Sequence, residues 1–150
     1  MSVVTLTGEA AMLTFGRAIA EHLRAGDVIA LEGDLGAGKT SLARGILAGL
    51  GVTGDMPSPS FAIVQAYDPP EARLPVLHVD LYRLDDDADV RELGLDEALD
   101  EGAIILEWPQ RLGLALWKHS LRLRIEGAGT PARRLTAEVS PSWKDRWPPQ

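Results

Sequence analysis

The sequence contains no cysteine, which excludes disulfide bonds, thiolate metal sites and cysteine nucleophiles together. It has 3 histidines, His22, His78 and His119, and no two of them are three or four residues apart. A zinc site held by neighbouring histidines on one helix is therefore not expected.

Long hydrophobic runs are missing as well. No run approaches the roughly 20 apolar residues of a membrane span. The first residues, MSVVTLTGEA, lack the basic start and the apolar stretch of a signal peptide. We therefore expect a cytoplasmic protein without membrane contact. With 150 residues, 45% of them hydrophobic, the chain is long enough for one domain with a buried core.

Positive charge is scarce. There are 15 Lys and Arg against 22 Asp and Glu, which gives a net charge of −7. Proteins that bind nucleic acid on their own usually carry a basic surface, so direct binding to tRNA or DNA is disfavoured. Many of the acidic residues lie between Asp85 and Glu101. This run is either a solvated helical face or a docking surface for a basic partner.

Apolar segments separated by turn residues predict the order of helices and strands. Helical spacing marks residues 8–24 and 39–50, and short apolar runs that suit strands occupy residues 28–31, 61–67, 76–81 and 103–106. Short helices are expected within 87–101 and 108–116, and a hairpin is expected from strands 121–125 and 135–139. The alternation predicts a single α/β domain over residues 1–139, with a mostly parallel sheet, antiparallel edge strands and flanking helices.

Residues 140–150, which contain proline and tryptophan, follow no pattern, and we expect a poorly ordered tail.

The segment Gly33-Asp34-Leu35-Gly36-Ala37-Gly38-Lys39-Thr40 matches the phosphate-binding pattern G-x-x-x-x-G-K-[ST]. It follows a predicted strand and opens a predicted helix, which is the setting that a P-loop needs. Backbone N–H groups of such a loop surround phosphate oxygens, Lys39 can reach the β- and γ-phosphates, and the Thr40 hydroxyl can bind Mg²⁺. The alternative is a glycine-rich turn that caps an ordinary helix. ATP is favoured over GTP because the sequence has no asparagine, and so lacks the Asn-Lys-x-Asp element of many guanine-selective proteins.

Two acidic residues close predicted strands and are candidates to complete a magnesium-nucleotide site. Asp80 and Glu107 each follow an apolar strand segment, so that one can hold Mg²⁺ while the other orients the attacking water. The alternative for each is an ordinary acid at a strand end. Ser58 and Ser60 lie in a proline-flanked loop, where a hydroxyl could contact a γ-phosphate or simply form a turn. His78 is interpreted as a packing residue or a hydrogen-bonding neighbour.

Taken in order, these segments resemble the TsaE family of bacterial P-loop ATPases required for the threonylcarbamoyladenosine modification of tRNA. The matching segments are Gly33–Thr40, Pro57-Ser58-Pro59-Ser60-Phe61, His78-Val79-Asp80-Leu81-Tyr82-Arg83 and Glu107-Trp108. The resemblance covers roughly residues 5–139, and the His-x-Asp-Leu-Tyr-Arg segment is far more specific than the phosphate-binding pattern. It implies a single P-loop NTPase domain with a mixed sheet.

The resemblance also implies roles for individual residues. Lys39 corresponds to the phosphate-binding lysine, Thr40 and Glu107 to the magnesium ligands, and Asp80 to an acid important for hydrolysis. Ser60 stands where the family usually has threonine, so the hydroxyl is kept and the methyl group is lost. An arginine near the adenine is expected at Arg133 or Arg134. The expected catalytic residues are thus Lys39, Asp80 and Glu107, and the expected nucleotide-binding residues are Gly33, Gly36, Ala37, Gly38, Lys39, Thr40, Ser41, Ser60 and Trp108.

A member of this family would be a Mg²⁺-dependent ATPase, weak alone and activated by its partners. The implied partners are TsaD and TsaB, which transfer the threonylcarbamoyl group to adenosine 37 of tRNA, and tRNA itself would be met only indirectly. ATP hydrolysis would reset that complex between turnovers. Two other functions fit the same residues: a small-molecule kinase with Asp80 as the base, and a nucleotide-dependent switch that needs binding but no hydrolysis.

Overall fold

The computed structural model describes residues 2–34, 36–54, 56, 64–81, 94–107 and 120–149. The helices and strands along the chain are β1 (Ser2–Thr7), α1 (Glu9–Ala20), β2 (Val28–Glu32), α2 (Lys39–Gly49), β3 (Val64–Tyr67), β4 (Val76–Asp80), α4 (Leu95–Ala98), β5 (Ala103–Glu107), β6 (Ser120–Glu126), β7 (Ala132–Val139) and a 3₁₀ helix, η3 (Pro141–Trp143). Within these ranges, no helix combines the length and the apolar character that crossing a membrane requires.

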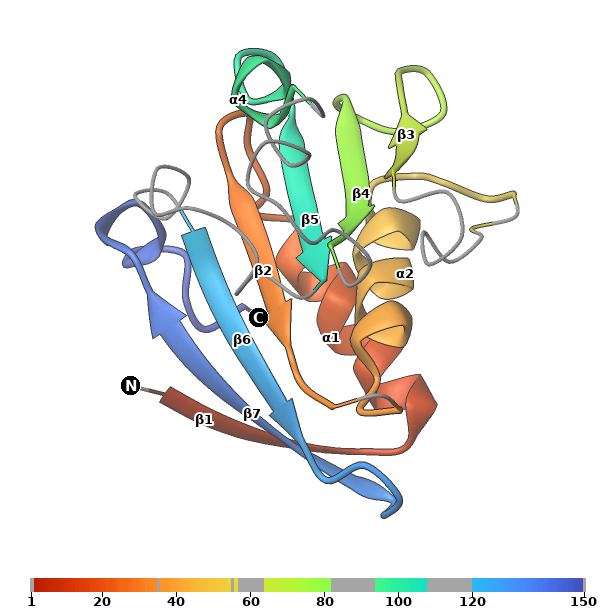
Figure 1. Ribbon diagram of the computed structural model, residues 1–150, viewed down its shortest axis with the longest axis vertical. Coiled ribbons are helices and arrows are strands. Elements are labelled where there is room, and N and C mark those ends of the chain that lie inside the picture. The colour runs from red at the N-terminus through yellow and green to blue at the C-terminus, as the bar shows by residue number, and fades with distance from the viewer. Residues whose placement is uncertain are drawn as a thin grey trace.

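The strands form one seven-stranded sheet in the order β1-β7-β6-β2-β5-β4-β3. Its centre, β6-β2-β5-β4, is parallel, and the pairs β6–β7, β1–β7 and β3–β4 are antiparallel. The predicted α/β class, with a parallel centre and antiparallel edges, is confirmed (Figure 1).

Both long helices cover the same face of this sheet. Their buried side chains, such as Ile19 of α1 and Leu42 of α2, join Ile29, Ile105 and Leu123 of the central strands in one apolar cluster. A smaller cluster on the other face holds Val28, Val79, Leu81, Leu95, Ile104 and Leu106, where α4 packs. Strands β2 and β5 are therefore buried on both faces, as continuous apolar runs predict.

One strand was not predicted from the sequence. β1 forms the edge of the sheet and pairs with β7 in the register Val4↔Leu135. Its residues alternate between half-buried and exposed, and none is fully buried. Such a strand has too weak an apolar signal to stand out, and its partner is more than a hundred residues away in the sequence.

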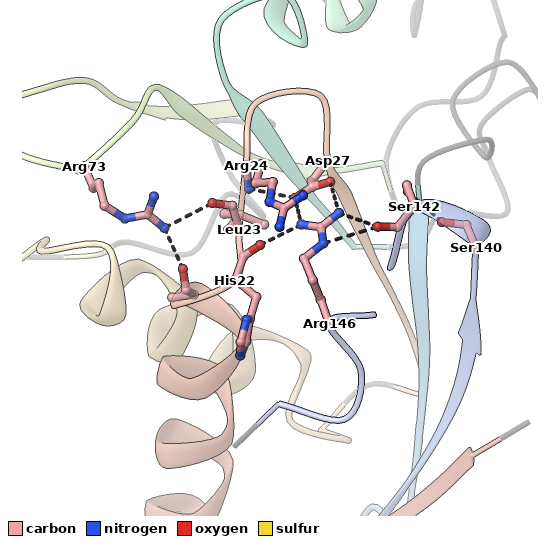
Figure 2. Close-up of polar contacts among 9 residues, drawn as sticks. His22, Leu23, Arg24, Asp27, Arg73, Ser140, Ser142 and Arg146 are labelled. Atoms are coloured by element: carbon pink, nitrogen blue, oxygen red, sulfur yellow. Dashed lines mark hydrogen bonds and ion pairs between the residues drawn. The ribbon is translucent and has the colours of Figure 1, made fainter. Parts of the chain in front are cut away.

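Residues 140–149 lie against the fold instead of forming the expected poorly ordered tail. Trp143 is fully buried, and the ring of Trp147 meets Phe15 edge-on at 5.7 Å between centroids. Arg146 makes a two-pronged ion pair with Asp27, with Nη1–Oδ2 and Nη2–Oδ1 distances of 2.6 and 2.9 Å (Figure 2). The segment is ordered because it buries large aromatic side chains and pairs a buried charge, neither of which shows as a periodic pattern.

Candidate functional site

The phosphate-binding loop connects the end of β2 to the start of α2, as the sequence predicts (Figure 1). Gly38 is the residue before the first turn of α2 and has a left-handed backbone with φ 110°. A side chain there would be strained, so glycine is required for this turn. At Gly33 an added Cβ would lie 2.6 Å from the carbonyl oxygen of Ile125. The loop therefore runs close against β6, with the N-terminus of α2 opening beside it.

Lys39, the first residue of α2, is buried and folds back across the loop. Its Nζ donates to the carbonyl oxygens of Gly33 at 2.5 Å and Asp34 at 3.0 Å. Burial lowers the pKa of Lys39 from its ordinary value, and the carboxylates of Glu107, Asp80 and Asp34 oppose that shift. The ammonium is thus partly stripped of water and surrounded by acidic groups, which suits it to a polyanionic ligand.

Asp80 and Glu107 end the two neighbouring parallel strands β4 and β5 and are paired in the sheet register. Because parallel strands end at the same edge of a sheet, both carboxylates reach the edge where β2 meets the phosphate loop. Both residues are buried. The Thr40 hydroxyl donates to Glu107 at 3.2 Å to Oε1. On the other side, Nε2 of His78 lies 2.7 Å from Oε2 of Glu107.

These groups fit a magnesium ion that a nucleotide brings with it. No cluster of three or more His, Asp or Glu side chains that could hold a metal ion occurs among the described residues. One hydroxyl and one carboxylate side by side, Thr40 and Glu107, are instead the small donor set that suffices when phosphate oxygens and waters supply the other ligands.

Arg133 joins the loop from β7. Its Nε donates to the carbonyl oxygen of Ala37 at 2.8 Å, and its Nη1 donates to the carbonyl oxygens of Gly127 at 2.8 Å and of Thr130. Arg134, the next residue, is exposed. Of the two arginines that the sequence leaves open, Arg133 is therefore the one in contact with the loop.

A cavity of about 510 Å³ lies beside the loop, between Asp34, Ala37, Arg124, Glu126 and Gly127. Ser41, also expected at the site, lies in the first turn of α2, and its hydroxyl is 3.4 Å from Glu9 of α1. Ser58, Ser60 and Trp108 lie outside the described residues.

Comparison with known proteins agrees with this geometry. Residues 6–135 match the family described as threonylcarbamoyl adenosine biosynthesis protein TsaE. The chain belongs to the TsaE family. The predicted resemblance is therefore confirmed, and it extends over most of the chain.

Individual TsaE relatives are similar over comparable lengths. The tRNA threonylcarbamoyladenosine biosynthesis protein TsaE of Streptomyces coelicolor is 40% identical over 138 residues, which cover 91% of this chain and 93% of the relative. The Bacillus subtilis protein of the same name is 39% identical over 118 residues, 78% of this chain and 72% of the relative. The crystal structure of Bacillus subtilis YdiB shares the fold with a TM-score of 0.75 and 29% identity, covering 96% of this chain and 88% of that one.

Sequence reasoning missed two contacts of this candidate site. It did not link His78 to Glu107, although the spacing His-x-Asp puts His78 on the same strand face as Asp80, and Asp80 pairs with Glu107. It also did not separate Arg133 from Arg134. The alternation along the hairpin strand would have sent the two side chains to opposite faces, but it does not say which face meets the loop.

Proposed function

We propose that this chain binds Mg²⁺-ATP and hydrolyses it as a cytoplasmic accessory subunit in the threonylcarbamoylation of adenosine 37 of tRNA. In this proposal the chain acts on a TsaD–TsaB complex and allows it repeated turnovers. The observation that carries the nucleotide part is the contact of the Thr40 hydroxyl with the buried carboxylate of Glu107 at the mouth of the phosphate loop. Membership of the TsaE family supports the process.

Each group of the site has a task in this proposal. Backbone N–H groups at the start of α2 and the Lys39 ammonium bind the phosphates. Thr40 and Glu107 would hold Mg²⁺, which supplies positive charge against the phosphate oxygens. We assign to Asp80 the orientation of the attacking water and the acceptance of its proton. The water oxygen bonds to the γ-phosphorus while the bond to the β–γ bridging oxygen breaks, so that ADP and phosphate leave.

The net charge of −7 supports an indirect relation to tRNA. A phosphate backbone is bound mainly through basic side chains, and this chain has an excess of acidic ones. A protein partner that carries the tRNA contacts is therefore the simpler arrangement.

The decisive experiment measures threonylcarbamoyladenosine in bulk tRNA from cells depleted of this protein. We expect the modified nucleoside to fall, and to be restored by the wild-type chain but not by Lys39→Ala. An unchanged level on depletion would refute the assigned process, and restoration by Lys39→Ala would refute the role of ATP.

A second variant separates hydrolysis from binding. Asp80→Asn should bind ATP with nearly wild-type affinity and hydrolyse it at least about tenfold more slowly, in line with loss of a group that positions a proton transfer. If this variant nevertheless restores the modified nucleoside, nucleotide binding alone is what the pathway requires, and the chain acts as a switch.

A further inference from the structure

His78 is a buried polar residue to which the proposed hydrolysis assigns no task. It lies in the middle of β4 with 1% of its surface exposed. Its Nε2 is 2.7 Å from Oε2 of Glu107 on the neighbouring strand. The other ring nitrogen, Nδ1, is buried and has no hydrogen-bond partner in the part of the chain that the structure describes. Among the described residues the imidazole therefore makes one hydrogen bond, and its partner is an expected magnesium ligand.

The direction of this hydrogen bond follows from what each group can offer. An ionised carboxylate only accepts, so Nε2 of His78 carries the hydrogen and donates it to Glu107. Nδ1 is then the nitrogen that has no partner among the described residues. The opposite assignment would bury an unpaired N–H at Nδ1, which costs more than an unpaired acceptor. His78 thus acts as a fixed donor to Glu107.

This donor contacts one of the two oxygens of the Glu107 carboxylate. Oε2 is occupied by His78 at 2.7 Å, and Oε1 is the oxygen nearer to the Thr40 hydroxyl, at 3.2 Å against 3.4 Å for Oε2. The terminal torsion of a glutamate is broad and has no strong preference of its own. Without the contact to His78, the carboxylate could rotate away from Thr40.

We propose that His78 is a positioning residue, which fixes the Glu107 carboxylate toward Thr40 so that the metal-nucleotide site is formed before its ligand arrives. The proposal rests on the proposed function, since it assumes that Thr40 and Glu107 receive Mg²⁺. Groups that orient metal ligands from behind typically change metal affinity about 10–100-fold when they are removed.

The test is the binding of a fluorescent ATP analogue to the full chain at graded Mg²⁺ concentrations and in EDTA. His78→Leu, which keeps the volume but not the donor, should raise the Mg²⁺ concentration for half-maximal binding about 10–100-fold. Affinity for the analogue in EDTA should stay within about twofold, because the phosphate loop itself is intact. His22→Leu is the matched control, since the half-buried His22 follows the C-terminal end of α1 (Figure 2), and it should not shift either value.

Rescue by a conservative variant distinguishes positioning from packing. The amide nitrogen of glutamine takes nearly the place of Nε2, whereas that of asparagine takes nearly the place of Nδ1. His78→Gln should therefore recover most of the Mg²⁺ response, and His78→Asn should not. If His78→Leu does not fold, this pair alone carries the test, with melting temperatures to show that both variants are folded.

A double-mutant cycle tests whether His78 acts through Glu107. In a Glu107→Gln background, His78→Leu should add no further loss of Mg²⁺ response. An equal loss in both backgrounds, or no shift in the wild-type background, would overturn the positioning role alone. A wild-type chain whose nucleotide binding ignores Mg²⁺ would overturn the proposed function, and this inference with it.

Discussion

Tyr67 is a buried residue whose hydroxyl lacks the hydrogen bond that buried polar groups usually make among the described residues. It ends the edge strand β3 with 4% of its surface exposed. Its hydroxyl is buried and has no hydrogen-bond partner among the residues that the structure describes. Burial raises the pKa of Tyr67 above its ordinary value of 10.0, the nearby Glu71 raises it further, and Arg44 opposes them. The buried hydroxyl therefore lowers the free energy of unfolding.

We expect Tyr67→Phe to raise the free energy of unfolding by about 1 kcal/mol at pH 7, because it removes a buried hydroxyl that no described residue pairs. With the raised pKa, the native wild type keeps its phenolic proton above pH 10.0 while the unfolded chain loses it. Its stability must then fall as the pH rises past that value. The variant should lack this part of the alkaline loss. Urea unfolding of both proteins at pH 7 and above pH 10 measures both effects, and a variant less stable than wild type at pH 7 would contradict the account.

Lys39 carries a buried positive charge, and the proposed function assigns it to phosphate binding. Burial is the main influence on its pKa and disfavours the charged form, even though three carboxylates lie near. Lys39→Met keeps the aliphatic stem and removes the charge. We expect the melting temperature of the ligand-free protein to be unchanged or higher, and ATP affinity to fall about 100-fold, or about 2.7 kcal/mol. Thermal melting and a binding titration of the same preparation check both halves, and a clear drop in melting temperature would show that the charge stabilises the fold.

At the scale of elements, α1 and α2 pack with their backbones almost in contact. An added Cβ would lie 2.6 Å from the carbonyl oxygen of Leu42 at Gly16, 2.5 Å from that of Leu13 at Gly45, and 2.6 Å from the Cβ of Ala20 at Gly49. Glycine is otherwise the weakest helix former after proline. Glycine at these three positions lowers helix propensity but lets the two helices approach closely. This packing positions α2, which carries Lys39 and Thr40.

Gly45→Ala tests this packing, because propensity and contact predict opposite signs. Propensity alone would stabilise the helix by about 1 kcal/mol. Pressing a methyl group onto the backbone of α1 should instead destabilise the protein by about 1–3 kcal/mol. Gly54→Ala is the control, since an added Cβ there meets nothing within 4 Å. Chemical denaturation measures both variants, and a stabilised Gly45→Ala would mean that the helices have room to separate.

The elements that sequence predicts well are those whose signal is local. The phosphate loop, β2 and α2 follow one another within a short segment, and the apolar runs of β4 and β5 end at the acids that meet this loop. The contacts that sequence misses join distant parts of the chain. Asp27 and Arg146 are 119 residues apart, and the contact of His78 with Glu107 depends on which strands are neighbours. Neither pair leaves a pattern in its own neighbourhood.

At the scale of the whole molecule, the C-terminal segment connects the start of β2 to the last strands. Arg146 binds Asp27 and the carbonyl oxygens of His22 and Ser142 (Figure 2). Its guanidinium also lies 3.9 Å from the ring centre of Trp143. Both side chains of the ion pair are nearly inaccessible. Removing one partner would leave a buried charge without compensation.

We expect Arg146→Met to lower the free energy of unfolding by about 3–5 kcal/mol, the usual effect of breaking a buried ion pair. Nucleotide affinity below the melting temperature should stay within about twofold, because Asp27 precedes β2 while the phosphate loop follows its other end. The control Arg124→Met removes an arginine whose side chain is 65% exposed and should cost less than about 1 kcal/mol. Urea unfolding measures both variants. Equal losses in the free energy of unfolding would contradict the claim that the buried Arg146 stabilises the fold more than the exposed Arg124.

Because the first strand pairs with the last, the sheet can be completed only at the end of synthesis. β1 leaves the ribosome first, but its neighbour in the sheet is β7, and β6 must also emerge before the sheet extends past β2 on that side. A chain released before residue 120 would contain the phosphate loop and the strands β2, β5 and β4, yet β2 would be an open sheet edge. An open apolar edge pairs readily with other chains. Truncated translation products of this protein should therefore aggregate, even though they include most of the groups that we assign to the nucleotide.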